Sequence, residues 1–190
     1  MKNSKRILII FYLFFITTML FAQETRPDNW AKRVNNFGFK NLYRLNDSIY
    51  RSEQPDEKGF KVIDSLKIRS VLSLRSSYKD AKLTGKSIFN LYQVGMAADS
   101  FTDEEIIKAL QIIRDSPKPL LIHCVHGADR TGVVVAMYRI IFNGFTKEQA
   151  IDEMKNGEYN FHKVYQNIPD YIKKADIEYI KNKVNKKEKF

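Results

Sequence analysis

One segment has the residue types and the order needed for phosphoryl transfer: residues 120–132, Leu-Leu-Ile-His-Cys-Val-His-Gly-Ala-Asp-Arg-Thr-Gly. A wholly apolar run at 120–122 begins a strand that is expected to end at Cys124, and a helix is expected to begin at Arg130 after a tight loop. Successive backbone N–H groups in such a loop, together with the positive end of the helix, bind anions. The same surroundings favour the thiolate form of Cys124, and Arg130 can donate two parallel hydrogen bonds to a phosphate. The segment therefore predicts a thiolate nucleophile below a bound phosphate, acting without a metal.

Other interpretations fit this segment less well. A single Cys is usually an inert packing residue, but the neighbouring Gly, Arg and Thr in a strand–loop–helix setting favour a reactive thiol. The pair Gly127 and Gly132 has the spacing of a nucleotide-binding loop, yet Val133 stands where that loop requires Lys. A rhodanese-type sulfur-transfer loop is one residue shorter. We expect His123 to order the loop from a buried position, and His126 either to line the rim or to face solvent.

The segment resembles the signature of the protein-tyrosine and dual-specificity phosphatases, His-Cys-x5-Arg-Thr. Residues 50–55, 72–75 and 161–167 are similar to a compact, secreted bacterial branch of the dual-specificity phosphatases, so the resemblance covers roughly residues 42–175. It implies Cys124 as the nucleophile, Arg130 as the phosphate ligand and Thr131 as a group that helps the thiolate leave. It also implies that the whole loop binds substrate, through Val125, His126, Gly127, Ala128, Asp129, Arg130 and Thr131.

Cleavage of a phosphate ester by a cysteine also requires an acid to protonate the departing oxygen. In the family that the chain resembles, this acid is an Asp on a loop before the helix that precedes the signature strand. Asp99 falls in such a loop, ahead of Thr102. Asp103 falls in the first turn of the helix, where a carboxylate usually complements the helix dipole. We therefore expect Asp99 to be the general acid, with Asp103 as the alternative.

The resemblance implies a phosphatase that needs no metal or cofactor and hydrolyses phosphate monoesters through a phosphocysteine intermediate. Members that act on inositol polyphosphates or phosphoinositides tend to carry Lys in the loop. The loop positions here hold Val125, His126, Ala128 and Asp129. Because an extra carboxylate disfavours a polyanionic ligand, protein phosphotyrosine is the expected substrate. The alternatives are an inositol-phosphate or phosphoinositide phosphatase and, in another class, a phospho-ligand binding module without turnover.

Strands and helices alternate around the segment. Alternating apolar and polar residues at 41–51, about Asn46, predict a β-hairpin. Short strands are expected at 71–74 and 88–94, and residues 120–122 suit a buried central strand. The expected helices lie at 58–66, from Thr102 to about residue 115, at about 131–142, after Thr146, and around residues 168–179 as one last helix. This order indicates an α/β fold, a central, mostly parallel sheet with helices on both faces, as in dual-specificity phosphatases.

The first 22 residues have the features of an export signal. Lys2, Lys5 and Arg6 precede an uncharged run at 7–21, and Ala22 supplies a small residue for cleavage. The run is shorter than the roughly 20 residues that span a bilayer. We therefore predict a signal peptide at 1–22 and a secreted or periplasmic protein with no membrane span after cleavage; an uncleaved anchor is the alternative. A mobile leader at 23–36, a cysteine phosphatase domain at 37–185 and a basic tail at 186–190 complete the predicted organisation.

Composition limits the remaining possibilities. One Cys excludes an intramolecular disulfide framework, and three His leave too few soft ligands for a structural zinc site. Removing residues 1–22, with three basic and no acidic side chains, lowers the net charge from +10 to +7. This surplus attracts anions in general, but no stripe of basic and aromatic residues indicates nucleic-acid binding. We expect a monomer whose partners are phosphorylated proteins or small phosphate esters.

Overall fold

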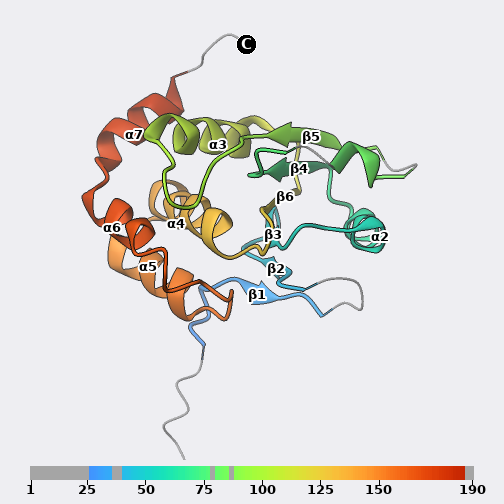
Figure 1. Ribbon diagram of the computed structural model, residues 1–190, viewed down its shortest axis with the longest axis horizontal. Helices are drawn as coiled ribbons and strands as arrows, with labels where there is room; N and C mark the ends of the chain where they lie inside the picture. Colours follow the sequence, from blue (N-terminus) through green and yellow to red (C-terminus); the bar gives the residue numbers. More distant parts are fainter. Residues whose placement is uncertain (1–25, 36–39, 78–79, 86–87, 187–190) are drawn as a thin grey trace, which may run out of the picture.

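The computed structural model describes residues 26–35, 40–77, 80–85 and 88–186 (Figure 1). The predicted export signal at 1–22 and nearly all of the predicted basic tail lie outside these ranges. Within them, no helix has both the length and the apolar character needed to cross a membrane.

A six-stranded sheet forms the centre of the molecule. Its strands are β1 (Lys32–Arg33), β2 (Tyr43–Arg44), β3 (Ile49–Ser52), β4 (Ser70–Ser73), β5 (Asn90–Gln93) and β6 (Leu120–His123), in the spatial order β1-β2-β3-β6-β4-β5. The last four of this order run parallel, whereas β1 and β2 add an antiparallel edge. The mostly parallel sheet, the hairpin of β2 and β3, and the buried central strand β6 are thereby confirmed.

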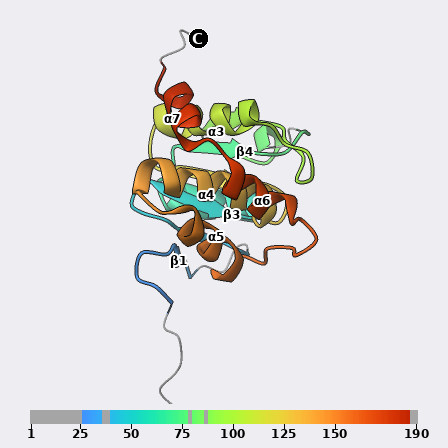
Figure 2. The same ribbon diagram turned by 90° about the vertical axis from the view of Figure 1, so that its left-hand side faces the viewer.

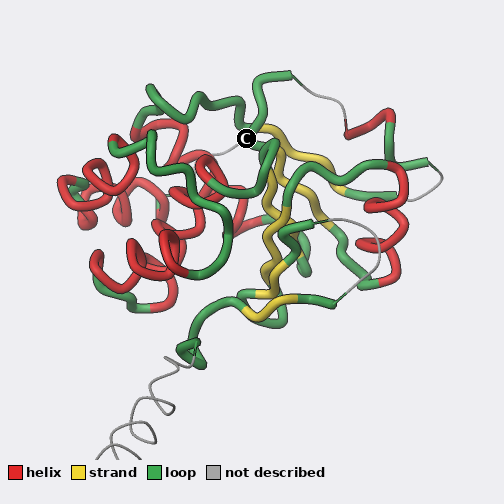
Figure 3. The backbone as a smooth tube through the Cα atoms, turned by 60° about the horizontal axis from the view of Figure 1, so that its bottom comes forward, coloured by secondary structure: helices red, strands yellow, loops and turns green. Residues whose placement is uncertain are grey.

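Helices cover both faces of this sheet, as predicted. They are α2 (Glu57–Ser65), the short 3₁₀ helix η1 (Asp80–Lys82), α3 (Asp103–Asp115), α4 (Asp129–Asn143), α5 (Lys147–Asn156), α6 (Asn167–Lys174) and α7 (Ile177–Asn185). Figures 1 and 3 show α3 to α7 gathered on one side of the strands, with α2 on the other, and Figure 2 views the sheet from the side of α3 to α7. Successive residues of a strand point to opposite faces. In β6, Leu121 therefore packs in the cluster that contains α2, while Leu120 and Ile122 pack in the larger cluster beneath α3 and α4.

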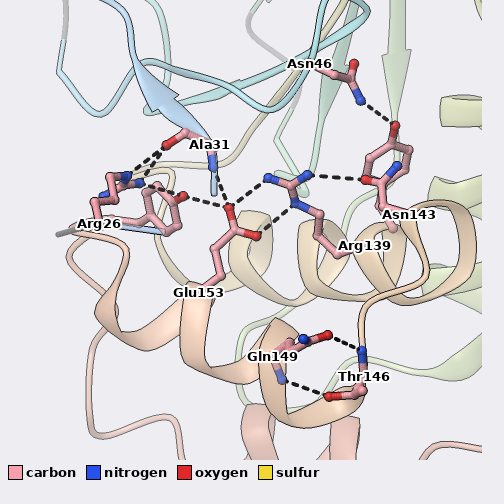
Figure 4. Close-up of polar contacts among 10 residues, drawn as sticks. Arg26, Ala31, Asn46, Arg139, Asn143, Thr146, Gln149 and Glu153 are labelled. Carbon is pink, nitrogen blue, oxygen red and sulfur yellow. Dashed lines mark hydrogen bonds and ion pairs between the residues drawn. The ribbon is translucent and has the colours of Figure 1, made fainter. Parts of the chain in front are cut away.

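The helix boundaries follow from local chemistry. Thr102 accepts a hydrogen bond from the backbone of Glu105, whose side chain in turn accepts from the backbone of Thr102. Thr146 and Gln149 form the same capping box at the start of α5 (Figure 4). Gly144 ends α4 with a φ of 70°, a left-handed conformation that favours glycine. These three signals were readable in the sequence.

The expected single last helix is wrong, because the chain forms α6 and α7 instead. Ala175 is extended, with ψ at 133°, and ends α6. The side chain of Asp176 then accepts a hydrogen bond from the backbone N–H of Tyr179 at 2.9 Å and caps α7. An Asp that bonds to nearby backbone competes with helix continuation. As a result, Tyr179 is 42% exposed and does not share the buried face of Ile168 and Ile172.

The described part of the predicted mobile leader is built into the domain. Ala31 is fully buried, and β1 pairs with β2 through the partners Lys32 and Arg44. Arg26 donates a hydrogen bond to the carbonyl of Ala31 at 2.6 Å (Figure 4). It also donates to the carbonyl of Gly157 at 3.0 Å. Hydrogen bonds of polar groups, and not an apolar face, hold this segment in place, so its sequence shows no hydrophobic periodicity. The folded domain therefore begins earlier than residue 37.

A buried ion pair joins this segment to two helices. The Glu153 carboxylate of α5 accepts hydrogen bonds from Nε and Nη2 of Arg139 in α4, at 2.8 and 3.0 Å. It also accepts from the backbone N–H of Ala31 at 2.8 Å and from the Tyr159 hydroxyl at 3.0 Å (Figure 4). Both charged side chains are almost fully enclosed. Because a buried charge is costly without its partner, the pair fixes how β1, α4 and α5 pack together.

We predict that Glu153→Ala lowers the free energy of unfolding by about 3–5 kcal/mol, because Arg139 would remain buried without a counter-charge. Urea unfolding followed by circular dichroism measures this loss. The matched control is Asp152→Ala, an exposed carboxylate in the same helix whose side chain bonds only to Asn156 among the contacts described. Its loss is expected to stay below about 1 kcal/mol. Equal losses in the two variants would contradict the structural role of the ion pair.

Candidate active site

The predicted site lies where the central strand meets the first turn of α4. Cys124 follows β6 directly and is only 2% exposed. The N-cap of α4 is Ala128, which has no side chain able to bond the first N–H groups of the helix. These donors therefore lack the usual cap and remain suited to an anion.

Three successive carbonyl groups of the loop are bonded on its outer side. Val125 O accepts from the backbone N–H of Gln54 at 3.0 Å. His126 O accepts from Asn41 Nδ2 at 2.8 Å, and Gly127 O accepts from Arg51 Nη2 at 2.7 Å. In a trans peptide the N–H points away from the C=O of the same unit. Holding the carbonyl groups outward therefore turns the following N–H groups inward, which gives the loop the form of an anion-binding nest.

Gly127 is the residue that allows the loop to lie against the strand next to it. Its φ is +68°, which glycine adopts readily. A Cβ at this position would lie 2.3 Å from Ser52 O and 2.6 Å from Glu53 N, both of which are backbone atoms. A larger residue would therefore push the loop away from β3.

Arg51 supports the loop from below, a role that was not predicted from the sequence. Its side chain is 1% exposed, and its guanidinium lies 3.7 Å from the ring centroid of Tyr159. Burial lowers the pKa of this guanidinium below its usual value, although the nearby Tyr159 and Glu153 oppose the shift. Burial also raises the pKa of Tyr159, which keeps its hydroxyl protonated and able to donate to Glu153. In the sequence, Arg51 lies at the end of the predicted hairpin and within the stretch 50–55 that resembles the family, but neither signal predicts that its side chain is buried.

His123 orders the loop from the core, as expected. It is fully buried, with Nδ1 at 3.1 Å from Cys124 O and Nε2 at 2.9 Å from Asp80 Oδ2. Burial alone would raise the pKa of Asp80, but hydrogen bonds from His123 and Gln54 and nearby positive charge outweigh it, so the pKa lies below its usual value. Both ring nitrogens of His123 thus lie against oxygen atoms, which fixes the orientation of the ring and holds the carbonyl of Cys124 in place.

Arg130 and Thr131 lie at the start of α4, next to the carboxyl ends of the strands. Arg130 is half-buried, and its Nη1 donates to Met96 O at 3.3 Å and to Leu74 O at 3.5 Å. Thr131 is fully buried, and its Oγ1 has no hydrogen-bond partner among the described residues. A buried hydroxyl without a partner is available to a group that enters the loop.

The two candidate acids have different surroundings. Asp99 is exposed on the loop before α3, where its Oδ1 accepts from Ser100 Oγ at 3.1 Å. Asn167 bonds to the carbonyl of Ala98 at 2.8 Å and so fixes this loop against α6. Asp103 instead accepts a hydrogen bond from the Tyr171 hydroxyl at 2.7 Å, which ties α3 to α6. Burial, together with this bond, raises the pKa of Tyr171. Asp103 therefore has a structural partner in Tyr171. Asp99 lies on the loop that begins at Met96, whose carbonyl contacts Arg130, so this loop passes close to the predicted site.

The remaining predicted substrate-binding residues divide into rim and base. Val125 and His126 are exposed at the rim, whereas Gly127 and Ala128 are buried and offer mainly backbone.

The expected free carboxylate in the loop is not found. Asp129 accepts from the backbone N–H of His162 at 3.0 Å and lies 2.8 Å from its Nδ1. The carboxylate is therefore bonded to the segment between α5 and α6 instead of standing free in the loop. His126, Asp129 and His162 form the one group within the described ranges whose donor atoms could hold a metal ion.

Comparison with known proteins places this geometry among phosphatases. Residues 34–190 match the model of the tyrosine phosphatase family. The dual specificity protein phosphatase TpbA of Pseudomonas aeruginosa is 30% identical over 156 residues, which are 81% of this chain and 70% of that protein. The inositol diphosphatase SIW14 of Saccharomyces cerevisiae is 32% identical over 117 residues, 55% of this chain and 41% of that one.

Solved structures of the same two proteins share the fold. A crystal structure of P. aeruginosa TpbA in complex with pTyr has a TM-score of 0.77 at 28% identity and covers 85% of this chain and 100% of that one. The core catalytic domain of the PP-IP phosphatase SIW14, in complex with citrate, has a TM-score of 0.69 at 26% identity and covers 78% and 93%. A family match over most of the chain, on the fold of these enzymes, means that the chain belongs to the tyrosine phosphatase family and is a cysteine-based phosphatase.

Proposed function

We propose that this chain hydrolyses phosphate monoesters through a phosphocysteine intermediate on Cys124, with protein phosphotyrosine as its substrate. The observation that carries the proposal is the loop after β6, whose carbonyl groups are bonded outward to Gln54, Asn41 and Arg51. A preorganised set of inward N–H donors stabilises the charge that develops on a transferring phosphoryl group. We further propose that residues 1–22 direct export, as their charge pattern suggests.

The reaction follows in two steps. In the first, the Cys124 thiolate attacks phosphorus, the ester P–O bond breaks, and Asp99 gives its proton to the departing oxygen. In the second, water attacks the phosphocysteine, Asp99 takes a proton from that water, and the S–P bond breaks. The Thr131 hydroxyl stabilises the departing thiolate. Arg130 and the loop N–H groups hold the non-bridging oxygens in both steps.

Two comparisons support the choice of substrate. The relative described as a dual specificity protein phosphatase aligns with 81% of this chain, against 55% for the inositol diphosphatase. The rim of the loop carries Val125, which is 37% exposed, rather than Lys. An apolar rim suits the ring of a phosphotyrosine better than several phosphate groups. Inositol diphosphatase activity is the second candidate, favoured by the bond between Asp129 and His162, which gives this loop carboxylate a hydrogen-bonded partner.

We predict that Cys124→Ser abolishes phosphate release from p-nitrophenyl phosphate and retains binding of inorganic phosphate, since the loop and Arg130 stay intact. Release measured against time, with calorimetric binding of phosphate to the variant, tests both parts. In the parent protein, iodoacetate at neutral pH should inactivate and phosphate should protect. A parent that binds phosphate without any turnover would instead be a binding module.

We predict that Asp99→Asn lowers kcat for phenyl phosphate by about 10²-fold or more and lowers it much less for p-nitrophenyl phosphate, because a good leaving group needs little protonation. Asp103→Asn is the matched control. It should cost about 1 kcal/mol of stability through the weakened bond to Tyr171 and the helix dipole, with no dependence on the leaving group. If Asp103→Asn shows the leaving-group dependence instead, the two roles are exchanged.

We predict that kcat/KM is at least about tenfold higher for a phosphotyrosyl peptide than for an inositol pyrophosphate, equivalent to about 1.4 kcal/mol of transition-state preference. Val125→Lys should shift this ratio toward the inositol substrate, because it adds a positive charge at the rim. Steady-state kinetics on both substrates with both proteins supply the comparison. The reverse preference in the parent would assign the chain to inositol diphosphate hydrolysis.

A further inference from the structure

Three side chains that can donate a ligand atom to a metal ion meet at the loop of residues 125–131, the phosphate loop of the proposed reaction. The reaction steps above use none of these side chains. His126 belongs to the loop itself, Asp129 is the first residue of α4, and His162 lies in the segment between α5 and α6. One donor atom from each lies within 4.8 Å of the other two. The sequence brings two of its three histidines together here, although 36 positions separate them.

The cluster is partly preorganised. The Asp129 carboxylate accepts the backbone N–H of His162 at 3.0 Å and lies 2.8 Å from its Nδ1, so these two side chains are fixed relative to each other. The rings of His126 and His162 have centroids 5.3 Å apart, with their planes at 64°. The side chain of Asn41 bonds to the backbone carbonyl of His126 and holds it in place. The imidazole ring of His126 is exposed and can rotate. The side chain of Asp129 is 8% exposed and that of His162 is 45% exposed. The cluster is therefore closed toward α4 and open toward solvent.

The donor set indicates the kind of ion. Two imidazole nitrogens and one carboxylate oxygen suit Zn²⁺, and also Co²⁺ or Ni²⁺, whereas Mg²⁺ and Ca²⁺ prefer oxygen ligands. Tetrahedral zinc at its usual bond lengths holds donor atoms about 3.3 Å apart. Rotation of the exposed His126 ring can close most of the difference from 4.8 Å. The proton between Asp129 and His162 would be released to solvent when the ion binds.

We propose that His126, Asp129 and His162 form a binding site for Zn²⁺ at the edge of the phosphate loop, and that the bound ion inhibits the enzyme. Two of the three ligands belong to the segment that holds the phosphate. An ion there, with its remaining water ligands, occupies space at the edge of the loop that a phosphopeptide must approach. Inhibition should therefore raise KM more than it lowers kcat. Arg130 and the positive end of α4 oppose a cation, so the site binds more weakly than a structural zinc site.

Metal binding is measured directly, by calorimetric titration of Zn²⁺ into metal-free protein and by the visible absorption of Co²⁺ in its place. The parent and Cys124→Ser should each bind one ion at micromolar concentration. His126→Asn and His162→Asn should each weaken binding by about tenfold or more. Asp170→Asn, which removes an exposed carboxylate from α6, should bind as the parent does. Unfolding midpoints check each variant, and His126→Asn decides if His162→Asn fails to fold.

Inhibition is measured separately, with each variant compared to its own metal-free activity. Micromolar Zn²⁺ should raise KM for a phosphotyrosyl peptide in the parent, a chelator should restore it, and both histidine variants should resist. Loss of binding in Cys124→Ser would overturn the proposal by placing the ion on the thiolate. Unchanged binding in both histidine variants, or none in the parent, would also overturn it. The binding assay on Cys124→Ser involves no turnover, so its outcome does not depend on the proposed function.

Discussion

The hydrogen bond from Arg51 to the carbonyl of Gly127 connects the core of the protein to the loop that follows Cys124. A guanidinium that is 1% exposed can stay charged only with partners, and these form a chain of contacts. Its face lies over the ring of Tyr159, whose hydroxyl donates to Glu153, the counter-ion of Arg139. The loop is therefore held by Arg51, whose position depends on the buried contacts that Glu153 makes with α4 and with the segment before β1.

A second buried pair acts from beneath the nucleophile. Asp80 and His123 lie on the strand side of the loop, and His123 bonds to the carbonyl of Cys124 itself. Arg51 holds the carbonyl of Gly127 and His123 holds that of Cys124, so the loop backbone cannot relax away from a bound anion. Such preorganisation is the main source of catalysis where the chemistry is charge stabilisation, since no reorganisation is needed during the reaction.

The sequence was sufficient for features that are set locally. The capping boxes at Thr102 and Thr146, the glycine after α4 and the loop at Cys124 are all contained within a few neighbouring residues. Features set by distant partners were missed. Arg51 and Gly127 are 76 positions apart, and Asp129 and His162 are 33 apart, so neither contact leaves a local pattern. The segment 26–35 was misjudged for the same reason: its order depends on Glu153 and Gly157, more than a hundred positions away.

The edge strand β1 has a consequence for contacts between molecules. It is two residues long and consists of Lys32 and Arg33, both exposed. An open sheet edge offers unpaired N–H and C=O groups to any other strand, and short, positively charged edges discourage that pairing. β1 therefore also ends the sheet on its antiparallel side. The β1 strand of a second copy of this chain would meet two side chains of its own charge there, and only two residues whose backbone could pair with it.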